Sequence, residues 1–199
     1  MRIIRVEHGG TSYYGILEDG LVFRLHQQPG HMEPIPLSEA KVLPLVTPSK
    51  VVCVGLNYKA HAEELGYPLP NMPSFFLKPP SSIIGNGEPI VLPSGMGRIE
   101  HEAELAMVVG KVCRNLTPEE AEESLFGFTC ANDVTAREVQ KVDPLIGHCK
   151  SYDTFCPIGP WIETELEDIN DLSIRCLVNG EVRQSANTGD MIFRPLDLL

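Results

Sequence analysis

Three carboxylates are spaced as a metal site would require. Glu102 and Glu104 are two residues apart in a stretch, 102–111, that is typical of a β-strand, and side chains two apart on a strand share one face. Asp133 follows in a second segment. Neighbouring carboxylates repel unless a cation or a shared proton lies between them, so three that converge would bind a hard divalent ion such as Mg²⁺, Mn²⁺ or Ca²⁺. The alternative for the glutamate pair alone is a solvated strand face.

The residues after Asp133 could extend such a site. Arg137 and Gln140 follow it by four and seven positions, which on one helix would place the three side chains on one side. A guanidinium and an amide suit the oxygen atoms of an anionic substrate. Two simpler roles for Asp133 remain open, as a helix cap or as the partner of Arg137 in a salt bridge along the helix.

Lys150, His61 and Glu64 are further candidates. Lys150 lies between apolar and proline-rich stretches, where it could be a fixed cation near the metal or a surface lysine. His61 and Glu64 are three residues apart in a short predicted helix, 59–66. Such a dyad would raise the basicity of the imidazole and make it a general base, although exposed pairs of this kind are common.

Composition excludes several classes of partner. The formal net charge of -11 disfavours nucleic acid and anionic membranes, which would repel this chain. The six cysteines form no regular framework, as expected for reduced thiols. The sequence shows neither a signal peptide nor an apolar run near the ~20 residues that span a bilayer. We therefore expect a soluble, cytoplasmic protein.

The elements that must position these residues are mostly strands, which predicts an α+β, β-rich fold with few and short helices. A small N-terminal β unit over residues 1–48 should contain a hairpin at Asp19-Gly20. The main domain should cover residues 49–199, with a helix at 118–125 that Thr117 and Glu120 cap. A second short helix should begin near Thr135. The remaining expectations are strands at 51–54, 74–78, 89–92 and 126–131, a connector at 27–36, and a hairpin at 172–186 that turns at Asn179-Gly180.

Together these motifs resemble the fumarylacetoacetate hydrolase family. The resemblance covers roughly residues 50–195 and depends on four segments in family order. The segments are Gly55-Leu56-Asn57-Tyr58 with His61 and Glu64; His101-Glu102-Ala103-Glu104-Leu105-Ala106; Asn132-Asp133-Val134-Thr135-Ala136-Arg137; and Lys150-Ser151-Tyr152-Asp153-Thr154-Phe155 with Pro157-Ile158-Gly159-Pro160.

The resemblance implies a β-roll-like catalytic domain and a set of residue roles. Glu102, Glu104 and Asp133 would hold Mg²⁺ or Mn²⁺. The oxo and carboxylate oxygens of the substrate would face Arg137, Gln140 and Lys150. A lid segment would contain His61 and Glu64, which would perform acid-base chemistry. The family usually continues beyond the point where this sequence stops, so the C-terminal part of the domain is expected to be missing. A homodimer is also implied.

The implied substrates are small 2-oxo or 1,3-dioxo acids, which react through an enolate that a divalent metal stabilises. A 2-hydroxyhepta-2,4-diene-1,7-dioate isomerase or an acylpyruvate-type carbon–carbon hydrolase fits this description best. Oxaloacetate decarboxylase is the alternative within the family. From another class, a non-catalytic ligand-binding module or an inactive fragment would also fit.

Overall fold

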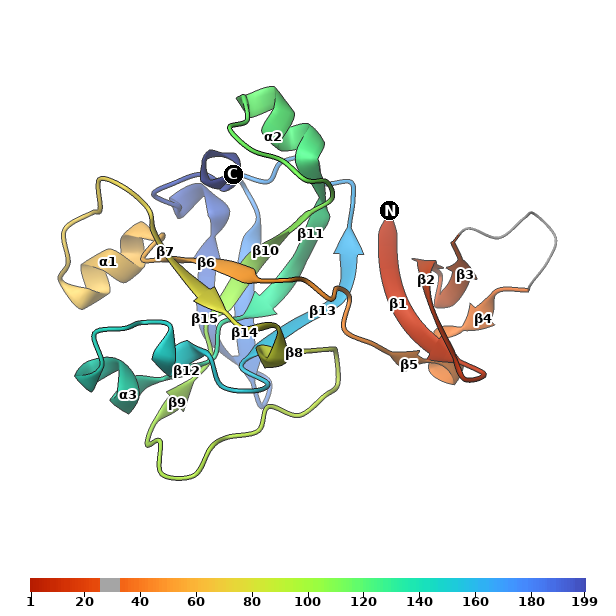
Figure 1. Ribbon diagram of the computed structural model, residues 1–199, viewed down its shortest axis with the longest axis horizontal. Helices are drawn as coiled ribbons and strands as arrows, with labels where there is room; N and C mark the ends of the chain where they lie inside the picture. The colour runs from red at the N-terminus through yellow and green to blue at the C-terminus, as the bar shows by residue number, and fades with distance from the viewer. Residues whose placement is uncertain (26–32) are drawn as a thin grey trace.

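A computed structural model of the chain describes residues 1–25 and 33–199 (Figure 1). Strands dominate, and the three α-helices in these ranges are each six or seven residues long. The predicted α+β class is therefore confirmed. Most strands belong to one sheet with the order β10-β11-β13-β1-β2-β3-β4, while β5 pairs with β1 and β8 pairs with β13.

The N-terminal unit forms the predicted antiparallel strands. They turn at Asp19 and Gly20, whose positive φ angles of 47° and 78° suit a tight hairpin. Its elements are β1 (Arg2–His8), β2 (Thr11–Glu18), β3 (Leu21–Arg24), β4 (Ile35–Pro36), η1 (Leu37–Glu39) and β5 (Lys41–Val42). The predicted connector 27–36 is wrong at its end, because Val22 of β3 pairs with Ile35. Residues 27–32 of that connector lie outside the described residues.

Strand β13 (Cys156–Glu163) joins the N-terminal unit to the rest of the chain. On one side it pairs with β1, with Ile3 opposite Ile162, and on the other side it pairs with β11. Its inward side chains share one core with the N-terminal strands. The buried members of this core are Ile3, Ile4, Val6, Leu17, Val22, Leu45, Cys156, Ile158 and Ile162. The two segments therefore form one continuous sheet and core.

A separate hairpin carries the predicted lid helix. It consists of β6 (Val51–Gly55) and β7 (Ser74–Lys78), with α1 (Lys59–Leu65) between them, as the sequence predicts. The chain continues through η2 (Pro80–Ser82) and β8 (Ile83–Ile84). The strand predicted at 89–92 is wrong, because the Val91 amide donates instead to Thr154 Oγ1 at 2.8 Å. Pro89 lacks an amide proton, which further disfavours strand pairing there.

The strands next to the acidic candidates pair with each other, β10 (Ala103–Val109) with β11 (Leu125–Asn132) (Figure 1). Helix α2 (Pro118–Ser124) has the predicted capping box, since the Glu120 amide donates to Thr117 Oγ1 and the Thr117 amide donates to Glu120 Oε2. The strand predicted from Glu102 begins one residue later. The elements are β9 (Ile99–Glu100), β10 (Ala103–Val109), α2 (Pro118–Ser124), β11 (Leu125–Asn132), β12 (Thr135–Ala136), α3 (Arg137–Val142) and η3 (His148–Lys150).

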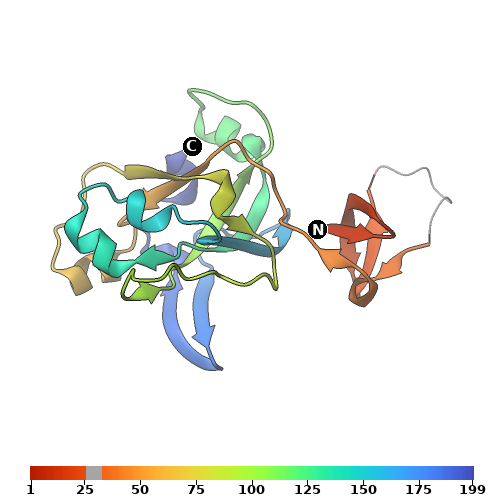
Figure 2. The ribbon, with the colours of Figure 1, turned by 60° about the horizontal axis from the view of Figure 1, so that its bottom comes forward.

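The predicted C-terminal hairpin is confirmed. Strands β14 (Ser173–Val178) and β15 (Glu181–Asn187) turn at Asn179 and Gly180, with φ angles of 53° and 83°. Figure 2 shows this hairpin extending away from the main body. Short 3-10 helices η4 (Thr188–Asp190) and η5 (Pro195–Leu198) follow it. Within the described ranges, no helix has the length and apolar character to cross a bilayer.

The contact between β11 and β13 predicts a sensitive glycine. A Cβ added to Gly127 would lie 2.5 Å from the carbonyl oxygen of Glu163 and 2.7 Å from Ile162 Cγ2. We expect Gly127→Ala to cost about 1–3 kcal/mol, which lowers the Tm of a domain of this size by several degrees. The measurement is thermal unfolding by circular dichroism.

Gly147→Ala is the matched control for this substitution. A Cβ at Gly147 would meet only the Leu77 carbonyl oxygen, at 3.6 Å, and its backbone is helical. We expect its Tm to equal or slightly exceed that of the unmodified chain. Equal effects of the two substitutions would show that the close approach of β11 and β13 is unimportant.

Candidate active site

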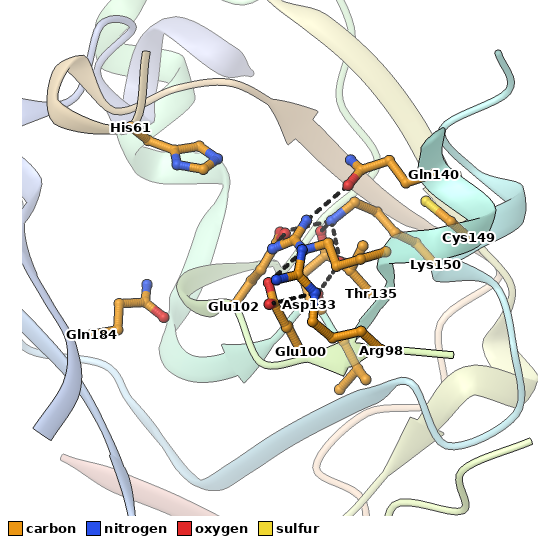
Figure 3. Close-up of polar contacts among 12 residues, drawn as sticks. His61, Arg98, Glu100, Glu102, Asp133, Thr135, Gln140, Cys149, Lys150 and Gln184 are labelled. Atoms are coloured by element: carbon orange, nitrogen blue, oxygen red, sulfur yellow. Dashed lines mark hydrogen bonds and ion pairs between the residues drawn. The ribbon is translucent and has the colours of Figure 1, made fainter. Parts of the chain in front are cut away.

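A buried lysine lies at the centre of the candidate site. Lys150, in η3, is only 3% exposed and donates to Glu102 Oε2 at 2.6 Å and to Asp133 Oδ2 at 2.6 Å (Figure 3). Its third hydrogen bond goes to Thr135 Oγ1 at 2.8 Å. An ammonium group has three protons, so all three are used. Lys150 is therefore a buried cation that bridges two predicted metal ligands, and not a surface lysine.

A second buried lysine was not predicted from the sequence. Lys78, the last residue of β7, is 1% exposed, and its Nζ donates to Asp133 Oδ1 at 2.5 Å. It also approaches the Val134 carbonyl oxygen at 3.4 Å. The available signal was strand alternation, since Phe76 and Lys78 share one face of β7 and Phe76 is buried. A lysine on an apolar face requires a buried counter-charge, which Asp133 provides.

Arg137 connects two more carboxylates. Its Nη2 lies 2.6 Å from Glu102 Oε1, and its Nε donates to Glu100 Oε2 at 2.7 Å. Nη1 donates to Gln140 Oε1 at 2.9 Å. The predicted proximity of Arg137 and Gln140 thus appears as a direct hydrogen bond. Glu100 was not among the site residues predicted from the sequence.

The prediction that Asp133, Arg137 and Gln140 share one helix is wrong. Helix α3 begins at Arg137, and the extended residue Ala136 is its N-cap. The two residues before Arg137 form β12, which pairs with β9. Asp133 therefore neither belongs to the helix nor caps it, and it reaches the cluster from the end of β11.

Strand register explains why Glu102 and Asp133 meet. Ala103 in β10 is paired with Asn132 in β11. Beyond this pair, the Asp133 amide donates to the Glu102 carbonyl oxygen at 2.8 Å, and the Glu102 amide donates to Asn132 Oδ1 at 2.9 Å. The backbone bond and the bond to the Asn132 side chain together hold the two carboxylates side by side at the ends of neighbouring strands.

Glu104 differs from the other two carboxylates in its electrostatic state. Among the described residues it makes no hydrogen bond or ion pair. Burial, together with the charges of Glu102 and Asp133, raises the pKa of Glu104 to about 8. For Glu102, burial acts in the same direction, but Lys150 and Arg137 outweigh it and hold the pKa below its usual range. Glu104 thus lacks the cation that its two neighbours have.

Lys150 remains charged in this environment. Burial would lower its pKa, but the charges and hydrogen bonds of Asp133 and Glu102 raise it above the usual range. A group that stays protonated at neutral pH is unsuited to be a general base. Lys150 can therefore act as a fixed positive charge.

The carboxylate oxygens of the predicted ligands are the donor type that a hard divalent cation prefers. Glu102 and Asp133 are held by cations at both oxygens, yet each carboxylate offers about four acceptor positions, so positions remain for an ion. Glu104 has no ion-pair partner in the described part of the chain. As the side chains stand, no three potential ligands among residues 1–25 and 33–199 are grouped closely enough to hold an ion. The set Glu102, Glu104 and Asp133 therefore stays a prediction.

The predicted dyad forms but stands apart from this cluster. His61 Nδ1 lies 3.2 Å from Glu64 Oε2, and the two side chains are 45% and 75% exposed. Figure 3 shows His61 beside the cluster with no bond to its members. The pair in α1 thus has the predicted internal geometry, while its acid-base role stays a prediction.

The raised pKa of Glu104 predicts a pH-dependent stability. Above pH 8 the folded chain contains a charged, uncompensated Glu104, whereas near pH 6 this carboxyl is protonated. Because the folded state binds this proton more tightly, its contribution to stability is lost as the pH rises through about 8. We expect Glu104→Gln, without divalent ions, to raise the Tm by several degrees more at pH 8.5 than at pH 6. Thermal scans at both pH values would measure this.

Glu167→Gln provides the control, because Glu167 is exposed and has no ionic partner among the described residues. Its effect on the Tm should not depend on pH in this range. If Glu104→Gln behaved in the same way, Glu104 would be solvated and not buried against the other carboxylates.

Two family models match the chain. The model for the fumarylacetoacetate (FAA) hydrolase C-terminal domain matches residues 50–199, and the Rv2993c-like N-terminal model matches residues 1–44. The 2-hydroxyhepta-2,4-diene-1,7-dioate isomerase from Mycobacterium marinum is 34% identical in structure-based comparison. The superposition covers 100% of this chain and 79% of the isomerase chain, with a TM-score of 0.89. The maleylpyruvate hydrolase from Sphingobium sp. SYK-6, solved with manganese(II) and pyruvate, is 28% identical, with 100% and 81% coverage and a TM-score of 0.79.

Curated proteins are similar over most of the chain. Human mitochondrial oxaloacetate tautomerase FAHD2A is 42% identical over 172 residues, which are 83% of this chain and 54% of the human protein. An uncharacterised Archaeoglobus fulgidus protein is 45% identical over 165 residues, or 83% of this chain and 66% of that protein. The chain thus spans about half to two thirds of the length of these two relatives. With the family model matched over residues 50–199 and the shared fold, the chain belongs to the fumarylacetoacetate hydrolase family.

Proposed function

We propose that this protein is a divalent-metal-dependent enzyme that moves a proton next to the carbonyl group of a 2-oxo acid, as an isomerase or tautomerase. The names of two relatives support this reaction class, one a 2-hydroxyhepta-2,4-diene-1,7-dioate isomerase and the other an oxaloacetate tautomerase. In both reactions a proton leaves one atom and returns to another while an oxygen carries negative charge in between.

The main structural support for this proposal is the buried ammonium group of Lys150, which lies between two carboxylates. Such a preorganised charge in a water-poor site can stabilise the oxygen on which negative charge develops. Thr135 is the uncharged partner of Lys150, so a substrate oxygen that replaces this hydroxyl bond breaks no ion pair. Arg137, only 16% exposed at its side chain, pairs with the other oxygen of Glu102 and would orient a substrate carboxylate.

His61 is the proposed proton carrier. With Nδ1 facing Glu64, the other ring nitrogen is left to take a proton from the carbon beside the oxo group and to return it elsewhere. The electron pair of the broken C–H bond moves toward the carbonyl oxygen, which the positive charge of Lys150 would stabilise. Because α1 is exposed, it would have to close over the substrate for this step.

The proposed cofactor is a divalent ion held by Glu102, Glu104 and Asp133. When bound, it would polarise the oxo group of the substrate as a Lewis acid. Support comes from the uncompensated Glu104 and from the manganese(II) complex of the Sphingobium relative. Mg²⁺, Mn²⁺ and Ca²⁺ all suit an all-oxygen ligand set.

Other activities use the same residues. Acylpyruvate-type carbon–carbon hydrolysis would need His61 and Glu64 to activate water, and the Sphingobium relative is named a hydrolase. Oxaloacetate decarboxylation would need only stabilisation of the negative oxygen. A ligand-binding module without catalysis is the alternative of another class, which binding of oxalate without turnover of any 2-oxo acid would support. The homodimer and the cytoplasmic location stay predictions.

The metal proposal is tested with Glu102→Gln, which removes the charge but keeps an acceptor for Lys150. Loss of an outer-shell partner typically weakens metal binding about 10- to 100-fold, so loss of a ligand should weaken it at least as much. Isothermal titration with Mn²⁺ would measure this, with Glu167→Gln as the control. Unchanged affinity would remove Glu102 from the ligand set.

The proton-carrier proposal is tested with His61→Ala. We expect the rates of oxaloacetate tautomerisation and of acetylpyruvate hydrolysis to fall by about 100-fold or more, the usual contribution of a general base, while oxaloacetate decarboxylation changes little. Glu63→Ala, on the same exposed helix, is the control. Equal loss of all three activities would mean that His61 serves binding or closure and not proton transfer.

A further inference from the structure

Gln184 ties the C-terminal hairpin to the strand that carries the glutamate pair. Its Oε1 accepts from the Ala103 amide at 2.8 Å, and its Nε2 donates to the Ala103 carbonyl oxygen at 2.8 Å. Figure 3 shows Gln184 apart from the ionic cluster and without a bond to its members. Any influence of Gln184 on the cluster must therefore pass through the backbone of Ala103.

The backbone of Ala103 needs such a partner. Strand β10 is the end strand of its sheet, and Glu102 directs its own amide and carbonyl groups toward Asn132 and Asp133 of the neighbouring segment. Successive residues of a strand direct these groups to opposite edges, so those of Ala103 face away from β11. The carboxamide of Gln184 offers one acceptor and one donor, as a peptide group of another strand would.

The hairpin of β14 and β15 is irregular at the position of this contact. Strands β14 and β15 shift register between Cys176 and Leu177, and Cys176 is the residue paired with Gln184. Irregularities of this kind bend a strand and change the direction of its side chains. The register shift thus coincides with the residue that reaches across to β10.

Ala103 lies between Glu102 and Glu104, so its position sets the direction of both carboxylates. Register with β11 fixes one edge of this backbone, and Gln184 fixes the other. Without the second restraint, the strand could rotate about its pairing with β11, and the oxygens of the two glutamates would move relative to Asp133. Groups that restrain ligands in this way affect metal affinity without touching the ion.

We propose that Gln184 is a positioning residue that holds Glu102 and Glu104 in the orientation required for divalent-metal binding. The inference rests on the proposed function, because it takes these glutamates as metal ligands. It adds a residue from a hairpin that makes no other hydrogen bond to the carboxylate-bearing strand among the described residues.

The test is the Kd for Mn²⁺ of the Gln184→Leu variant, measured by calorimetry at a temperature where every variant is folded. Leucine approximates the volume of glutamine but can neither donate nor accept. We expect Mn²⁺ to bind about 10-fold or more weakly. Hydrogen exchange of the Ala103 amide in the metal-free protein should become faster, since its acceptor is removed.

Gly180→Ala is the matched control, because it weakens the same hairpin without touching Gln184. Gly180 has a φ of 83°, which strains any side chain, and an added Cβ would meet nothing within 4 Å. We expect this variant to have a lower Tm but an unchanged Kd. A structural role alone would instead weaken Mn²⁺ binding in both variants in proportion to their loss of stability.

The outcomes separate this inference from the proposed function. If the unmodified protein binds Mn²⁺ and Gln184→Leu binds it equally well, the positioning role is overturned and the metal proposal stands. The role is also overturned if Gly180→Ala matches Gln184→Leu in its loss of affinity. Failure of the unmodified protein to bind Mn²⁺ would overturn the metal proposal and the positioning role together.

Discussion

The balance of charge around Lys150 is the constraint on which the rest of the site depends. Burying carboxylates without cations is costly, and here Lys150, Lys78 and Arg137 engage both oxygens of Glu102 and of Asp133. Three separate parts of the chain provide these cations: the end of β7, the start of α3, and η3. The fold around the site is therefore the arrangement that brings all three to one pair of strand ends.

The same balance distinguishes the roles of the acidic side chains. Glu102 and Asp133 are compensated, whereas Glu104 is left with a pKa raised to about 8 by burial and by its two neighbours. A buried carboxylate that has no ion-pair partner is suited to an additional positive charge. Lys150 serves in this scheme as a fixed charge, because its carboxylate partners keep it protonated.

Much of the framework followed from local sequence. The hairpins at Asp19-Gly20 and Asn179-Gly180 have the expected left-handed turn residues, and α2 has its capping box. These are short-range effects, in which the turn or cap residue and its partner are close in the chain. The strand expected at 89–92 failed because the amide of Val91 is satisfied by Thr154, far away in the sequence. Local pattern does not reveal such a partner.

For the site, residue types and their spacing were enough to predict which groups could do the chemistry. These were acidic side chains two apart, an arginine with a glutamine on one helix, a lysine, and a histidine with a glutamate. The contacts between these groups depend on the fold and could not be predicted locally. The fold placed Asp133 at a strand end and not on the helix, and it brought Lys78 to Asp133 and Gln184 to the backbone of Ala103. The physical reason is that strand register and ion pairing join segments distant in the chain, and their energies depend on burial that no single segment specifies.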